Sequence, residues 1–127
     1  MDSGNKIEQY LIELKYSYRE IGENLWLIDD EENYLPEVAV MYDDPVVVFR
    51  VVMMDAPAER RLELFTRLLE LNASDLVHGA YGLEDGKIVL INTLDYETMD
   101  FGEFRSTLDA FSLALNQHYP ILSTYRG

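Results

Sequence analysis

Cysteine is absent from the 127-residue chain. Its absence excludes disulfide bonds, thiolate zinc sites and a cysteine nucleophile. The first ten residues, MDSGNKIEQY, also lack the basic start and the apolar stretch of a secretory signal. We therefore expect the protein to work in the cytoplasm.

Long apolar runs and linker-like stretches are missing as well. No apolar run approaches the roughly 20 residues that a membrane-spanning helix needs, so we expect no membrane partner. No internal repeat and no stretch rich in Pro, Gly and Ser divides the chain. With 48% apolar and 27% charged residues, the composition is typical of a globular protein. We predict one domain over residues 1–127.

Positive charge is scarce. Ten Lys and Arg residues stand against 24 Asp and Glu residues, which gives a formal net charge of −14. This charge repels phosphate backbones and anionic lipid headgroups, so nucleic acid and membrane surfaces are not expected as partners. It would speed the encounter with a basic protein. The alternative is that the acidity only keeps the protein in solution.

Residues that carry catalysis or hold cofactors are also few. The two histidines, His78 and His118, have no carboxylate at a metal-binding spacing, and no HExxH motif occurs. The acidic run at residues 29–32 lacks the ligand spacing and the central glycine of an EF-hand loop. No GxxxxGK[ST] or GxSxG motif is present. We predict no catalytic residue, no metal site and no cofactor.

Hydrophobic periodicity and turn residues predict eight elements. Short links join the strands within each group, so the sheet is expected to be mainly antiparallel. The predicted fold is α+β, in the order α-β-β-β-α-β-β-α, with a five-stranded sheet and three helices. The expected elements are a helix from Asn5 to Gly22, strands at 24–28, 35–42 and 45–54, a helix from 55 to Asn72, strands at 77–83 and 87–94, and a helix that starts at Asp100 and bends or breaks near Pro120.

Three local signals support these elements. Asp85-Gly86 is typical of a type I′ hairpin turn, because the glycine accepts a positive φ angle. Asp100 and Glu103 form a capping pair at the start of the last helix. Apolar residues at helical spacing predict the buried faces of the first two helices. These faces are Ile7, Tyr10, Leu11, Leu14 and Tyr18 in the first helix, and Leu62, Phe65, Leu68 and Leu69 in the second, where Leu64 and Leu71 widen the stripe.

The strand VVVFRVVMM is apolar on both of its alternating faces, and Arg50 is its one charged residue. A sheet open to water on one side should alternate more cleanly. A contiguous apolar patch left exposed favours association. The predicted partner-binding residues are Val47, Phe49, Val51 and Ile91, or their neighbours on the opposite face. The alternative is that the helices cover both faces within one subunit.

One stretch carries a family resemblance. LLELNAS is followed by LVHGAYGLEDGKIVLINTLDYETM and a last amphipathic helix. The Asn-Ala at the end of the middle helix, the strand, the Asp-Gly hairpin and the next strand resemble the fold shared by type III secretion chaperones (CesT-like) and YbjN-type proteins. The order of elements matches over essentially the whole chain.

This resemblance implies a non-enzymatic protein-binding domain of bacterial origin. The secretion chaperones are small, acidic, cytoplasmic and usually homodimeric, and they hold client segments extended along apolar patches. YbjN-type relatives are described as sensory-transduction or regulatory proteins. No client can be read from the chain, which favours the YbjN-like branch.

Two other function classes stay open. The nine tyrosines could line a pocket, so the alternative function is a small-molecule or ion-binding sensor. An enzyme would need a cleft that gathers His78 or His118 with carboxylates.

Overall fold

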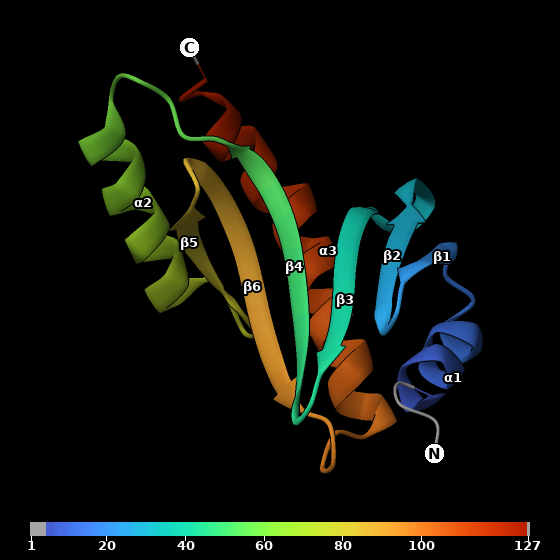
Figure 1. Ribbon diagram of the computed structural model, residues 1–127. Helices are drawn as coiled ribbons and strands as arrows, with labels where there is room; N and C mark the ends of the chain where they lie inside the picture. Colours follow the sequence, from blue (N-terminus) through green and yellow to red (C-terminus); the bar gives the residue numbers. More distant parts are fainter. Residues whose placement is uncertain (1–4, 127) are drawn as a thin grey trace.

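The chain forms one antiparallel sheet, and its helices pack on one face of that sheet (Figure 1). The computed structural model describes residues 5–126. The strand order is β1-β2-β3-β4-β6-β5, and each neighbouring pair is antiparallel. The elements are α1 (Asn5–Leu14), β1 (Tyr18–Gly22), β2 (Leu25–Asp30), the short 3-10 helix η1 (Glu31–Asn33), β3 (Leu35–Asp43), β4 (Val46–Asp55), α2 (Arg61–Ser74), β5 (Ala80–Glu84), β6 (Lys87–Asp95) and α3 (Phe101–Ser123).

The α+β class and the antiparallel sheet are confirmed, but the sheet has six strands rather than five. The first helix was predicted to run to Gly22, and it ends at Leu14. Lys15 takes a left-handed conformation, with φ of 60°, and the chain turns there. Tyr18 and the residues after it pair with β2 as an additional strand. Tyr and Ile suit a strand, and the open edge of β2 supplies the partner that decides the conformation.

The buried face of helix α2 is narrower than predicted. It begins at Arg61 rather than in residues 55–57, and its buried side chains are Leu64, Leu68 and Leu71. Leu62 and Leu69 were predicted to face inward, but 82% and 69% of their surfaces are exposed. The helix carries two apolar stripes at helical spacing. The subunit buries one of them.

The two local signals at the turn and at the last helix are confirmed. Asp85 and Gly86 both have positive φ angles, 51° and 76°, as a type I′ turn requires. The Asp100 carboxylate accepts a hydrogen bond from the Glu103 amide at 2.8 Å, and the Asp100 amide donates to the Glu103 carboxylate at 3.1 Å. These features place the β5–β6 hairpin and fix the start of α3.

The core lies between the sheet and α3. Phe104, Leu108 and Phe111 of α3 are fully buried. The ring of Phe49 on β4 packs against Phe104, with centroids 5.3 Å apart. Helix α1 packs on α3 through Tyr10, whose ring lies 5.4 Å from that of Phe104.

The opposite face of the sheet has no such cover. Figure 1 shows β4 and β6 in front, α3 behind them, and no described helix in front of them. We call the face that packs on α3 the inner face and the other the outer face.

Candidate functional site

Three of the four predicted partner-binding residues lie on the inner face. Val47 and Phe49 are fully buried, and 3% of Val51 is exposed. Strand register puts Val51 opposite Leu90, which is also buried in the core. In this conformation a partner does not reach these three side chains. Ile91 is opposite Arg50 in the register, and it lies half-buried on the outer face.

The neighbours on the opposite face are the accessible ones. Register places Met41 beside Val48, and Ala39 beside Arg50, on the outer face. Val52 and Met41 are 42% and 38% exposed. The outer-face patch, as we define it, consists of Leu27, Ala39, Met41, Val48, Val52 and Ile91. It is an apolar surface that spans β2, β3, β4 and β6.

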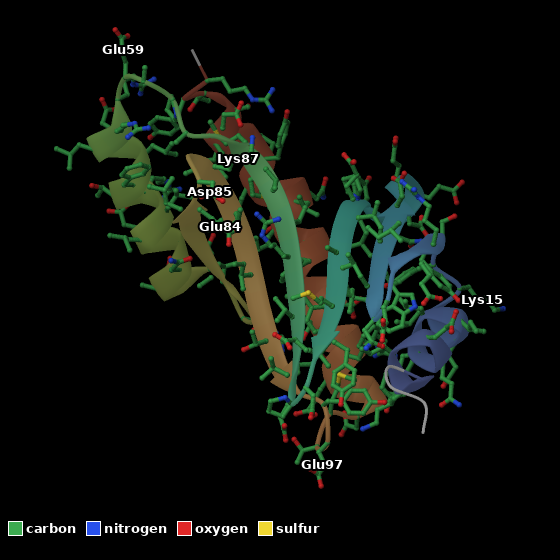
Figure 2. The ribbon with its side chains drawn as sticks, viewed as in Figure 1. Lys15, Glu59, Glu84, Asp85, Lys87 and Glu97 are labelled. Carbon is green, nitrogen blue, oxygen red and sulfur yellow. The ribbon has the colours of Figure 1, made fainter. Side chains whose placement is uncertain are left out.

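An ion pair divides this face. Nε of Arg50 on β4 donates to Oε1 of Glu84 on β5 at 2.6 Å. Strand β6 lies between these two strands, so the ion pair crosses β6, near Val89. Only 1% of Val89 is exposed, although Val89 is not part of the core on the inner face. Figure 2 shows Glu84 and Lys87 together at this end of the sheet. An exposed ion pair of this kind contributes little to the stability of the fold.

A second apolar surface lies at the edge of the sheet. The exposed stripe of α2 meets β5, which pairs with β6 on one side and, within residues 5–126, with no strand on the other. Leu83 on β5 is 55% exposed. A hollow of about 180 Å³ lies between the two elements, lined by Phe65, Leu68, Leu69, Asn72, Tyr81, Gly82, Leu83 and Ile88. We call Leu62, Phe65, Leu69 and Leu83 the α2–β5 patch.

One histidine does meet a carboxylate. Nδ1 of His118 lies 2.7 Å from the Tyr81 hydroxyl, and its Nε2 lies 3.4 Å from Oδ2 of Asp75. Burial, followed by the charge of Asp75, raises the pKa of Tyr81 well above its ordinary value. The Asn72 side chain holds Tyr81 by accepting from its amide at 2.7 Å and donating to its carbonyl at 3.2 Å.

This chain of groups connects α2, β5 and α3 rather than forming an open site. His118 is buried, and the hollow beside it measures about 30 Å³. That volume is about the share of one water molecule in the liquid. His78 lies apart, in the segment between α2 and β5. Among residues 5–126, no group of three His, Asp or Glu side chains is placed to hold a metal ion.

The acidic run at residues 29–32 contains the end of β2 and the start of η1. The Asp30 carboxylate accepts hydrogen bonds from the Ser17 amide at 2.9 Å and from the Asn33 amide at 3.3 Å, which caps η1. The bond from Ser17 is the main reason that the pKa of Asp30 lies below its ordinary value. Asp30 therefore has a structural role in joining β1, β2 and η1.

Asp30→Asn is expected to lower the free energy of unfolding by about 1 kcal/mol at neutral pH, because one amide oxygen replaces two carboxylate oxygens. A carboxyl whose pKa is lowered on folding stabilises above its unfolded pKa, and this contribution disappears as the pH falls through the folded pKa. The gap between wild type and variant should therefore stay the same from about pH 7 to about pH 5 and shrink as the pH falls below about 4, as measured by urea unfolding. Glu32→Gln, at an exposed position of η1, is the control. A gap of constant size would contradict the assigned role.

Comparison with known proteins identifies relatives of this fold. The family model CesT_Tir_1 matches residues 2–126. The chain is similar to a chain of the heterodimeric ExoU–SpcU complex from the type III secretion system of Pseudomonas aeruginosa, with a TM-score of 0.75 and 18% identity over 93% of this chain and 98% of that chain. It is similar to YbjN from E. coli, with a TM-score of 0.65 and 19% identity over 88% and 89% of the two chains.

The chain is also similar to a chain of the HopA1–SchA chaperone–effector complex, with a TM-score of 0.65 and 7% identity over 87% of this chain and 88% of that chain. Identities this low show a shared fold alone. A comparison with curated proteins finds no significant match. Within residues 5–126, no helix is long and apolar enough to cross a bilayer.

Proposed function

Because the chain belongs to the CesT_Tir_1 family of type III secretion chaperones, we propose that it is a noncatalytic cytoplasmic domain that forms a homodimer and binds a partner polypeptide through apolar surface. Similar structures include a chaperone–effector complex and a heterodimeric secretion complex, which supports a polypeptide partner. A regulatory role, as in the YbjN-like branch, would use the same surfaces.

The observation that carries the homodimer is the α2–β5 patch. Leu62 and Leu69 are exposed on a helix whose other stripe is already buried, and Leu83 is exposed on the adjoining edge strand. An exposed apolar edge strand is a template for pairing with another chain. A two-fold axis along this edge would bring α2 against α2 and β5 against β5, so one patch serves both subunits.

The outer-face patch is then left for the partner polypeptide. It runs across four strands, and in this proposal the dimer axis at the sheet edge does not cover it. An extended segment could lie on Met41, Val48 and Val52, with apolar side chains facing the sheet. Of the residues predicted from sequence, Ile91 lies on this face.

Leu69→Glu is expected to weaken the dimer by about 10- to 30-fold, because it places a charge in the centre of a buried apolar contact. Sedimentation equilibrium over about 1 to 200 µM measures the change. Leu113→Glu is the matched control, since Leu113 is also an exposed leucine but lies on α3. A wild-type protein that stays monomeric over this range, or equal weakening by both substitutions, would overturn the proposed homodimer.

A further inference from the structure

The sheet is split between β3 and β4. These strands pair from Asp43 and Val46 to Ala39 and Arg50, and β4 then continues to Asp55 without β3 beside it. Figure 1 shows the two strands meeting at one end and spreading at the other, with α3 visible between them. A groove of about 710 Å³ occupies this split.

Backbone irregularities coincide with the split. Glu37 in β3 has a φ of 51°, and Tyr34 before β3 has a φ of 56°. On β4 the register shifts between Val52 and Met54, as in a β-bulge. These features keep β3 from following β4, so the far half of β4 has no neighbouring strand on that side within residues 5–126.

The walls of the groove are apolar and aromatic. Val52 lines one side, and Tyr34 and Tyr119 line the others. All three side chains are exposed. A groove of several hundred Å³ between aromatic walls fits a few aliphatic side chains, and the unpaired side of β4 offers main-chain groups to an extended segment.

The rim of the groove is suited to a cation. Among the described residues that line it, Glu31 and Glu37 are acidic and none is basic. Asn116 also lines it, and its carbonyl lacks the usual helical donor because Pro120, four residues on, has no N–H. The Tyr119 ring holds the guanidinium of Arg126 at 5.1 Å from its centroid, so a cation already lies beside the groove, and Glu31 and Glu37 are left for a cation of the partner.

We propose that this groove binds an extended segment of the partner polypeptide in which an aliphatic side chain is next to a lysine or arginine. This inference rests on the proposed function, because it takes the partner to be a polypeptide. The aliphatic group lies between Tyr34 and Tyr119, the cation faces Glu31 and Glu37, and the main chain runs beside β4. The net charge of −14 favours such a segment as it approaches.

The test uses the peptide GSLKVKSG with a fluorescent label, and its acidic counterpart GSLEVESG. Fluorescence anisotropy with the full-length protein should give at least about tenfold tighter binding for the lysine peptide. Glu37→Gln should weaken that binding by about two- to fivefold, as expected for one exposed charge pair. Equal binding of the two peptides would overturn the inference.

A pair of tryptophan substitutions locates the site. Asn116→Trp fills the groove from an exposed helical position and should weaken binding of the lysine peptide by at least about tenfold. Gln117→Trp, the next exposed residue of α3, lines a different hollow and should leave binding unchanged. Circular dichroism confirms that both variants are folded. If the two variants bind the lysine peptide with the same affinity, the peptide does not bind in this groove.

Two results separate this inference from the proposed function. Asn116→Trp should leave the sedimentation of the protein unchanged, because no residue that lines the groove also lines the hollow between α2 and β5. Leu69→Glu, which weakens the dimer, should still bind the lysine peptide. A wild type that dimerises but binds neither peptide refutes the groove and leaves the homodimer standing.

Discussion

Phe49→Ala is expected to lower the free energy of unfolding by about 3–5 kcal/mol, the usual cost of truncating a buried phenylalanine. The Phe49 side chain is fully buried, and its ring lies 5.3 Å and 6.3 Å, centroid to centroid, from those of Phe104 and Phe111. Alanine would leave a cavity between β4 and α3 that two aromatic rings and a sheet cannot easily fill. Urea unfolding at one fixed protein concentration measures the loss.

Val48→Ala is the matched control for the assignment of the two faces. Val48 is the preceding residue of β4 and lies half-buried on the outer face. Its truncation removes less buried surface and should cost below about 1 kcal/mol. If the two substitutions cost the same, the inner and outer faces of β4 have been assigned wrongly.

Gly79→Ala is expected to cost about 2–5 kcal/mol, for two separate reasons. Gly79 has a φ of 91°, which is unfavourable for a residue with a side chain. An added Cβ would also lie 3.0 Å from the Ile91 carbonyl oxygen and 3.3 Å from a ring carbon of Phe111. Both neighbours belong to packed elements, so the crowding adds to the conformational cost.

Gly86→Ala separates these two reasons. Gly86 also has a positive φ, 76°, but an added Cβ would meet no atom within 4 Å. Its replacement should cost only about 1–2 kcal/mol, as conformational strain. Thermal unfolding of both variants gives the comparison. Equal losses would mean that the chain before β5 moves away from Phe111 at little cost.

Much of the fold could be predicted because its signals are local. The Asp85-Gly86 turn and the Asp100–Glu103 cap depend on residues a few positions apart, and both form as expected. The family resemblance is confirmed by the family model, which covers residues 2–126. The order of helices and strands was correct apart from β1, because tertiary pairing with β2 decides the conformation of residues 18–22.

The faces could not be predicted in the same way. Both faces of β4 are apolar, so alternation alone does not say whether Phe49 or Val48 meets α3. The same ambiguity affects α2, where two apolar stripes fit one helix and Leu62 and Leu69 turn outward. The groove between β3 and β4 gave no signal at all, because residues 31–37, 51–53 and 115–120 are far apart in sequence.

Because the outer face is uncovered, the folding of one copy buries only part of the apolar surface of this chain, and the binding of a partner would bury the rest. Its apolar side chains stay hydrated when a single copy folds, so the heat capacity of unfolding should be lower than the apolar content suggests. A complex formed on that face would bury this remaining apolar surface, and its binding should show a negative heat-capacity change. Because hydrophobic contacts weaken on cooling, such a complex would loosen in the cold while the core behind the sheet stays intact.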